Sequence, residues 1–289
     1  MGASPEDSWS GLPGSLHAER RGAIAVLRLS RPDKRNALDD ATVLGLDRAL
    51  DGLPEDVKAV VLHGEGEHFS AGLDLNELTD RNVTEGIAHS RMWHRIFDRI
   101  EYGRVPVVAV LHGAVIGGGL ELAAAAHIRI AERSAFYALP EGSRGIFVGG
   151  GGSVRLPRLI GTSRMMDMML TGRSYDAEEG QAIGISHYLV APGEGLAKGI
   201  DLAKRIAGNA PTTNFAVTHV LPRIAQSDPA AGYLTEALIS AIAQADEEAK
   251  SRLKAFLEKR APKVVHRSAV HKKPARNKTL RNKTLRNKT

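Results

Sequence analysis

The chain has 289 residues, of which 43% are hydrophobic and 25% charged, so it can bury at least one full core. It has no cysteine, which excludes disulfides, thiolate metal sites and a cysteine nucleophile and fits a reducing compartment such as the cytoplasm. No stretch approaches about 18 uninterrupted apolar residues, so we expect a cytoplasmic protein without a membrane span.

The net charge of +6 is concentrated at the C-terminal end. Residues 259–289 hold twelve of the 39 Lys and Arg residues and none of the 33 Asp and Glu residues, so the rest of the chain is acidic. We expect residues 262–289, which repeat Arg-Asn-Lys-Thr-Leu, to be a basic low-complexity tail, and residues 1–14 to be a flexible N-terminus. Because only the tail is basic, nucleic-acid binding is not expected of the folded part.

The first part of the chain alternates short apolar runs with amphipathic stretches, which predicts strands and helices in turn. Strands are expected at 15–21, 23–30, 57–62 and 105–111, and helices at 40–50 and 83–102.

A glycine-rich segment, Gly113 to Glu121, follows and opens into the alanines of 123–126. This pattern predicts a tight turn that leads into a helix N-terminus. Backbone N–H groups at such a start can bind an anion or an oxyanion, and a simple packing turn is the alternative. The spacing matches neither a P-loop nor the dinucleotide-binding fingerprint.

Downstream, helices predominate over strands. Strands are expected at 127–131, 135–138 and 187–190, and helices at 153–159, 163–170, 176–183, 196–207, 214–225 and 233–257. The pattern predicts an α/β fold with a core over 15–200, which holds the active site, and a helical C-terminal region over 201–261.

Two glutamates stand out because apolar residues precede them. Glu121 lies in the first turn of the glycine-rich helix, and Glu141 follows Ala138-Leu139-Pro140. Burying a carboxylate is costly unless it is paired or protonated, so an acid in such surroundings is a candidate functional group, although either could be a surface residue. Two carboxylates held close together can act as an acid and a base.

Other reactive side chains give no clear site. The histidines lack the spacing of metal ligands, so no metal site is expected. Ser70 lacks the Gly-x-Ser-x-Gly frame of a nucleophile elbow.

Four segments together resemble the crotonase (enoyl-CoA hydratase/isomerase) superfamily, and the resemblance extends over about residues 16–260. They are Arg31 to Leu38, Phe69 to Asp74, Gly113 to Glu121, and Leu139 to Glu141. The resemblance implies a spiral of ββα repeats with a helical C-terminal region that trimerises, giving a homotrimer or a hexamer built as a dimer of trimers.

The resemblance also implies the chemistry. The activity would be addition of water to the double bond of an enoyl-CoA in fatty acid metabolism, with Glu121 and Glu141 as the catalytic pair. The backbone N–H groups of Leu73 and Gly118 would form an oxyanion hole for the thioester. No cofactor is implied, because coenzyme A is part of the substrate. The residues implied to bind it are Lys34, Arg35, Ala37, Ala71, Asp74 and Leu75.

A closer resemblance, to the methylthioacryloyl-CoA hydratase branch, is carried by His127-Ile128-Arg129 and by Arg144 to Gly151. Most of the family has Asp where this chain has His127, and members of that branch also hydrolyse the thioester. Three alternatives therefore stay open: that hydratase with hydrolysis, an enoyl-CoA isomerase, and a catalytically inactive relative that binds RNA or a protein partner.

Overall fold

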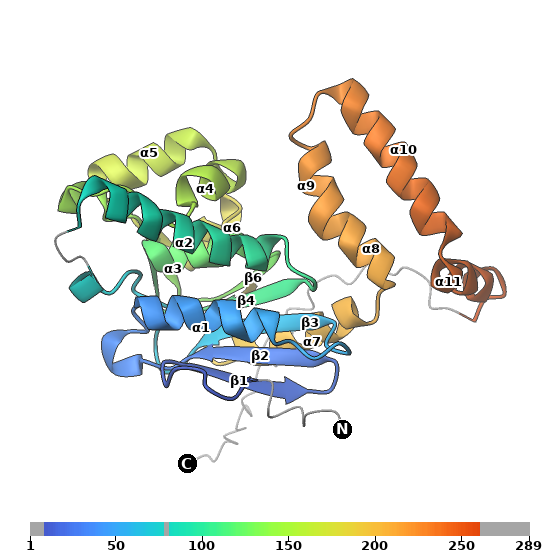
Figure 1. The fold of residues 1–289 in the computed structure, drawn as a ribbon, viewed down its shortest axis with the longest axis horizontal. Helices are drawn as coiled ribbons and strands as arrows, with labels where there is room; N and C mark the ends of the chain where they lie inside the picture. The colour runs from blue at the N-terminus through green and yellow to red at the C-terminus, as the bar shows by residue number, and fades with distance from the viewer. Residues whose placement is uncertain (1–8, 78–80, 261–289) are drawn as a thin grey trace, which may run out of the picture. The chain divides into compact units, whose positions relative to one another are not determined.

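The structure is a computed structural model that describes residues 9–77 and 81–260 (Figure 1). Among these residues, those up to Asp246 form one compact unit, and those from Glu247 to Arg260 belong to a second. The predicted basic tail at 262–289 lies outside the described residues, as does most of the predicted N-terminal segment. The division into a core and a helical region at residue 200 stays a prediction.

A six-stranded sheet forms the centre of the first unit (Figure 1). Its strand order is β1-β2-β3-β4-β6-β9, with β1 antiparallel to β2 and the other neighbours parallel. Parallel neighbours require crossover connections, which the helices supply. The strands are β1 (Leu16–Arg21), β2 (Ile24–Leu29), β3 (Ala59–Gly64), β4 (Val107–Leu111), β6 (Ile128–Glu132) and β9 (Tyr188–Val190).

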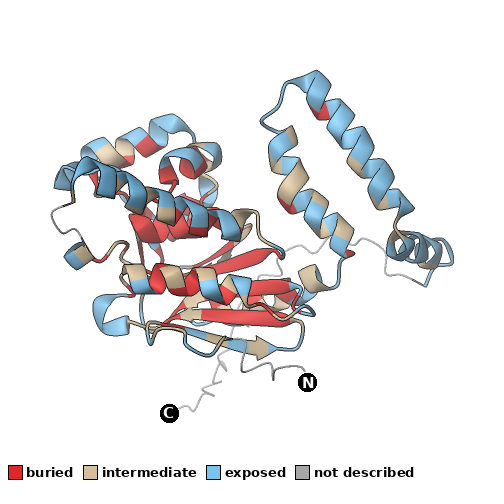
Figure 2. Ribbon diagram, in the orientation of Figure 1, coloured by how far each residue is buried: buried red, intermediate tan, exposed pale blue. Residues whose placement is uncertain are grey.

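Alternate residues of the central strands enter two separate apolar clusters, one on each face of the sheet. On one face Val61 and Val108 pack with Leu202 of α7 (Gly195–Ala207). On the other face Val60 and Ala109 join the larger cluster, which includes residues of α1 (Asp40–Asp51), α2 (Val83–Glu101) and α3 (Gly118–Ala125). The buried strands in Figure 2 reflect this double coverage, which explains the continuous apolar runs in the sequence.

The helices that cover the sheet begin where the sequence provides caps. Asp39 accepts the N–H of Thr42 to start α1, and Asn82 and Glu85 form a capping box at the start of α2. α3 has no side-chain cap, because the residue that precedes it, Gly117, has no side chain; its φ is +52°. Seven of its eight residues are buried, as its sequence predicted.

A second sheet, which the sequence did not reveal, lies within the glycine-rich segment and beyond it. β5 (Ala114–Ile116) pairs in parallel with β7 (Phe136–Ala138), and β7 pairs in antiparallel fashion with β8 (Tyr175–Asp176). The segment from Gly113 was expected to be a turn only. A strand of three residues between Gly113 and Gly117 is too short to give an alternating pattern.

The remaining helices lie near the expected positions, with two corrections. The helix predicted over 214–225 is interrupted by a π-helical turn, which precedes Pro222, a residue with no N–H to donate. The predicted helix over 233–257 is divided, because Asp246 leaves the helical conformation with ψ of 130° and ends α10 (Pro229–Ala245). α11 (Glu247–Leu257) belongs to the second unit. The others are α4 (Gly152–Ile160), α5 (Thr162–Thr171), α6 (Ala177–Ala182), α8 (Pro211–Phe215), a π-helical turn (Ala216–Val220) and α9 (Leu221–Ile224).

His127 has a structural position between α3 and β6. Its Nδ1 accepts the Val107 N–H at 3.0 Å, and its Nε2 lies 3.1 Å from the Glu101 carbonyl oxygen, to which it can donate. Burial lowers the pKa of His127 to about 4, so the ring is neutral at pH 7. A carboxylate, which the family resemblance expects here, could accept the same N–H.

We predict that His127 makes the protein sensitive to acid. In the unfolded chain the ring takes up a proton near pH 6.5, but in the folded chain only near pH 4, so the folded state loses stability as pH falls from 6.5 to 4. The full contribution is about 3 kcal/mol. His127→Asn keeps an acceptor for Val107, so its free energy of unfolding, measured in urea, should fall less steeply over this range. Parallel pH dependences for the parent and the variant would contradict the assignment.

Candidate active site

Three backbone segments meet at the short strand β5. On one side Ser70 forms a bridge with Val115, with Ser70 N–H donating to Ala114 and Ile116 N–H donating to Ser70. On the other side β7 pairs with β5 in a register that sets Ile116 beside Ala138. Each predicted site residue lies two or three residues after a paired one: Leu73 after Ser70, Gly118 after Ile116, and Glu141 after Ala138. The pairing therefore brings the predicted oxyanion donors and both glutamates to one place.

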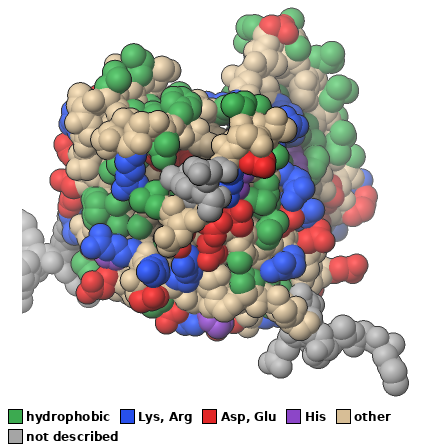
Figure 3. Space-filling view, turned by 60° about the vertical axis from the view of Figure 1, so that its left-hand side comes forward, with side chains coloured by type: hydrophobic (Ala, Val, Ile, Leu, Met, Phe, Trp, Pro, Cys, Tyr) green, Lys and Arg blue, Asp and Glu red, His purple; other side chains and the backbone are tan. Residues whose placement is uncertain are grey.

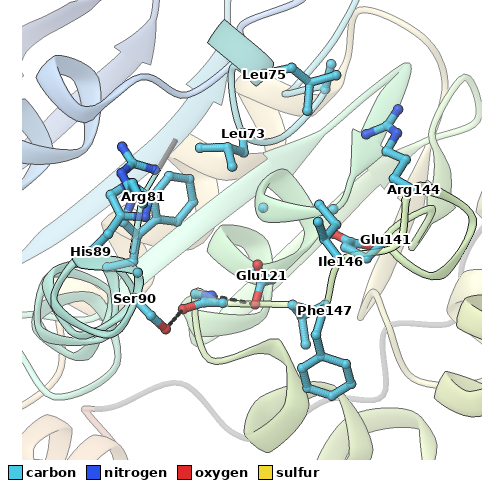
Figure 4. A pocket seen from close by; sticks show the side chains of 18 residues that line it. Leu73, Leu75, Arg81, His89, Ser90, Glu121, Glu141, Arg144, Ile146 and Phe147 are labelled. Carbon is cyan, nitrogen blue, oxygen red and sulfur yellow. Dashed lines mark hydrogen bonds between the residues drawn. The ribbon is translucent and has the colours of Figure 1, made fainter. Parts of the chain in front are cut away.

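A cavity of about 450 Å³ opens at this place. Both glutamates and both predicted oxyanion residues line it, and Figure 4 shows Arg81 and His89 on the side opposite Glu141 and Arg144. Its lining residues are Ala71, Leu73, Leu75, Arg81, Gly86, His89, Ser90, Trp93, Gly117, Gly118, Glu121, Glu141, Arg144, Ile146, Phe147, Val148, Gly149 and Gly150.

The N–H groups of Leu73 and Gly118 come close together. A Cβ atom on Gly118 would lie 3.2 Å from the Leu73 nitrogen, and one on Gly72 would lie 3.0 Å from the Gly118 nitrogen. Gly72 has a φ of +89°, which glycine adopts readily. Within residues 9–77 and 81–260 neither N–H has a hydrogen-bond acceptor. Two unpaired donors on a cavity wall are the geometry of an oxyanion hole.

Glu121 is buried, with 3% of its surface exposed, and its carboxylate is held by backbone donors. Its Oε1 accepts the N–H of Gly150 at 2.8 Å and the N–H of Gly152 at 2.7 Å. Burial raises the pKa of Glu121, and these N–H groups act in the opposite direction because they favour the charged form. The group is thus a buried carboxylate whose ionised form has dedicated partners.

Glu141 has a different environment. It precedes a 3₁₀ turn (Gly142–Arg144), it is 7% exposed, and its buried Oε2 accepts no hydrogen bond from the described residues. The pKa of Glu141 is raised to about 6, mainly by burial and also by the nearby charge of Glu121, while Arg144 acts in the opposite direction. The pKa of each carboxyl group is therefore raised by burial, but only the ionised form of Glu121 receives backbone N–H donors.

The residues predicted to bind coenzyme A divide into two groups. Ala71 and Leu75 line the cavity. Asp74 does not, and its carboxylate already has a partner, because Arg31 donates to it at 2.8 Å and thereby lowers its pKa. Lys34, Arg35 and Ala37 also lie outside the cavity lining, on the turn beside the loop of Ala71 and Gly72, where Ala71 N–H donates to the Arg35 carbonyl. Their contacts with coenzyme A stay a prediction.

One wall of the cavity was not predicted from the sequence. It is a face of α2 with Gly86, His89, Ser90 and Trp93, all on one side of a helix by their spacing. The spacing of these four residues is visible in the sequence, but it is also typical of an amphipathic helix that packs on a core, so it did not indicate a cavity wall. His89 is held there by Asp40, whose Oδ1 lies 2.7 Å from its Nε2.

Among the described residues no group of three or more His, Asp or Glu side chains could hold a metal ion. None of the helices in that part of the chain is long and apolar enough to cross a membrane. Acidic and basic side chains are interspersed over the face shown in Figure 3.

Comparison with known proteins gives consistent matches along the chain. The sequence profile of the enoyl-CoA hydratase/isomerase family matches residues 19–267. The short-chain-enoyl-CoA hydratase of Clostridium acetobutylicum is 33% identical over 245 residues, which cover 84% of this chain and 94% of that protein.

Solved structures agree with these matches. A provisionally assigned enoyl-CoA hydratase from Rhodopseudomonas palustris is 58% identical with a TM-score of 0.83, covering 85% of this chain and 95% of that one. The enoyl-CoA hydratase of Bacillus anthracis is 30% identical with a TM-score of 0.80, covering 86% and 98%.

We predict that Gly152 cannot be enlarged, because its neighbour is the Glu121 side chain. A Cβ on Gly152 would lie 2.8 Å from Cγ and from Oε1 of Glu121, so Gly152→Ala should displace the carboxylate and cost about 1–3 kcal/mol of unfolding free energy. Gly149→Ala is the matched control, since its Cβ would have only Ser90 Oγ within 4 Å, at 3.7 Å. Equal melting temperatures for the two variants would show that the contact is not tight.

Proposed function

The chain belongs to the enoyl-CoA hydratase/isomerase family, and we infer that it is an enoyl-CoA hydratase, which adds water across the α,β double bond of an enoyl-CoA thioester. The observation that carries this inference is the pair of glutamates, Glu121 and Glu141, on a cavity that also presents two unpaired backbone donors. Hydration needs an acid, a base and stabilisation of an enolate, and the cavity supplies a group for each.

The oxyanion donors act where charge develops. When water attacks the β-carbon, the electron pair of the double bond moves through the α-carbon onto the thioester oxygen and forms an enolate. The N–H groups of Leu73 and Gly118 would hold that oxygen, and each such donor is worth about 3 kcal/mol in the transition state. Because backbone pairing fixes both groups, little reorganisation is needed during the reaction.

The environments of the glutamates favour a division of roles. Glu121, whose charged form receives two N–H groups, would take a proton from the attacking water. Glu141, whose pKa burial raises to about 6, would deliver a proton to the α-carbon. The substrate gains the hydroxyl of water and a proton from Glu141, and the proton of water stays on Glu121. A proton must then leave Glu121 and one must return to Glu141, through solvent, before the next turnover.

The substrate supplies its own handle. We propose that coenzyme A binds as part of the thioester, that the reaction needs no separate cofactor, and that the enzyme works in the cytoplasm. The absence of cysteine from the whole sequence supports the location. Binding energy from the remote nucleotide would help to position the acyl group between the glutamates.

We also propose that the chain assembles through α10, as a trimer or a dimer of trimers. This helix carries a single charged residue, Glu236, and leaves four large apolar side chains more than half exposed. They are Tyr233, Leu234, Leu238 and Ile242. An exposed apolar face of this kind on a helix is a common feature of protein interfaces.

We predict that replacing either glutamate abolishes most of the hydration. Glu121→Gln and Glu141→Gln keep the shape of the side chain but remove its proton transfer, so the rate should fall by about 10²–10⁴-fold in each. The loss of crotonyl-CoA absorbance measures the rate, and chromatography identifies the product. A 3-hydroxyacyl-CoA product supports the proposal. Free coenzyme A would instead indicate thioester hydrolysis, and a shifted double bond would indicate an isomerase. Full activity in one variant would remove that residue from the mechanism.

We predict that Leu238→Glu lowers the oligomeric state, because it places a charge on the apolar face of α10. Sedimentation equilibrium should show three or six chains for the parent and fewer for the variant. Glu236→Lys, which changes a charge on the same helix without altering the apolar residues, is the control and should leave the mass unchanged. A parent that sediments as a single chain would refute the assembly.

A further inference from the structure

The carboxylate of Glu121 depends on a loop that is itself held from outside the cavity. Residues 149–152 form this loop, and the N–H groups of Gly150 and Gly152 point to Glu121. Gly151 has a φ of +96°, and a Cβ on it would lie 2.3 Å from the Arg155 guanidinium. Glycine runs are flexible in themselves, so other contacts must keep these donors in place.

Two side chains hold the carbonyl groups of the same loop. Ser90 of α2 donates its hydroxyl to the Gly149 carbonyl at 2.6 Å, as the dashed line in Figure 4 shows. Arg155 of α4 donates to the Gly150 carbonyl at 3.1 Å. Each peptide plane links a carbonyl to the next N–H, so holding the Gly149 carbonyl also orients the N–H of Gly150.

Arg155 is anchored in turn to α2. It is 6% exposed, and it donates to Asp98 at 2.6 Å and to Glu101 at 2.5 Å. A buried guanidinium with two carboxylates and a carbonyl has a fixed orientation, because the planar group donates in defined directions. Thus one helix, α2, holds both ends of the arrangement, through Ser90 directly and through Arg155.

We propose that Ser90 and Arg155 are positioning residues for hydration, which hold the 149–152 loop so that its N–H groups keep Glu121 in its reactive orientation and charge state. The proposal rests on the hydratase function inferred above.

The direction of the expected effect follows from the hydrogen bonds. N–H donation favours the charged carboxylate, so loosening the loop should raise the pKa of Glu121 and move the acidic limb of the rate profile to higher pH. Other titratable and charged groups face this region from α2, from α4 and from the segment after β7. They are His94, Asp98, Glu101, Arg155, Glu141 and Arg144, with Arg81 and His89 on the far wall of the cavity.

The variants separate position from charge. Ser90→Ala removes a neutral donor, and Ser90→Thr restores a hydroxyl. Arg155→Lys keeps the positive charge but loses the planar donor set, and Arg155→Met loses both. Two controls are Ser227→Ala, whose hydroxyl donates to the Ile224 carbonyl, and Arg164→Met, whose guanidinium donates to the Ile160 carbonyl.

Two readouts are needed, and one of them does not use activity. The first is the pH profile of kcat and KM with crotonyl-CoA. The second is ¹³C NMR titration of protein labelled at the glutamate carboxyl carbons, in which Glu121 is assigned by its loss in Glu121→Gln. If the parent shows no hydration, the proposed function fails, but the titration still tests the loop.

We expect Ser90→Ala and Arg155→Lys each to raise the Glu121 titration midpoint by about half a pH unit or more, and to lower kcat about tenfold with little change in KM. Ser90→Thr should recover most of the loss, and both controls should match the parent. An unchanged midpoint in both Ser90→Ala and Arg155→Lys would overturn the proposal. So would a shift seen only in Arg155→Met, which would mean that charge acts through space, or a raised KM with an unmoved profile, which would mean a substrate contact.

Discussion

The pairing of β5 with its two neighbours is the constraint on which the cavity depends. This strand has only three residues, Ala114 to Ile116, yet it pairs with Ser70 on one side and with β7 on the other. Backbone pairing fixes the register of these segments, and the chain leaves each of them directly into the cavity. The loop before Leu73, the start of α3 and the approach to Glu141 are therefore fixed relative to one another by the backbone.

The glycines of this region serve close approach as much as chain reversal. A side chain on Gly118 would meet the ring of Trp93 at 2.9 Å, and one on Gly152 would meet Glu121. Because these positions lack side chains, the backbone N–H groups can reach a carboxylate or a thioester oxygen directly. Two glutamates can then be buried on one cavity, where the carboxylate of Glu121 has backbone donors and Oε2 of Glu141 has no partner among the described residues.

The polar groups that hold the cavity wall are themselves held by residues of α2. This helix contributes Trp93 to the wall, Ser90 to the glycine loop and two carboxylates to Arg155. Its other face packs against α1 within the main core. The geometry of the cavity and the packing of the core are thus coupled through a single helix, so substitutions on its buried face can alter both.

The sequence by itself determined most of the fold and singled out the two glutamates that line the cavity. The apolar runs of the parallel strands, the capped helices and the buried helix after Gly117 are local patterns, and each was found at its expected place. Glu121 and Glu141 were identifiable because apolar neighbours surround them, and the motifs around them pointed to the family.

Only the tertiary structure decided how the site is completed. β5 is too short to carry a periodic signal. Ser90 and Gly149 are more than fifty positions apart in the sequence, and so are Arg155 and Glu101. The contact of Arg155 with the Gly150 carbonyl is closer in sequence, but it depends on a turn that the local pattern does not specify. Local propensity acts over a few residues, whereas the partner of a buried polar group is chosen by packing, which is why the second layer of the site appeared only in three dimensions.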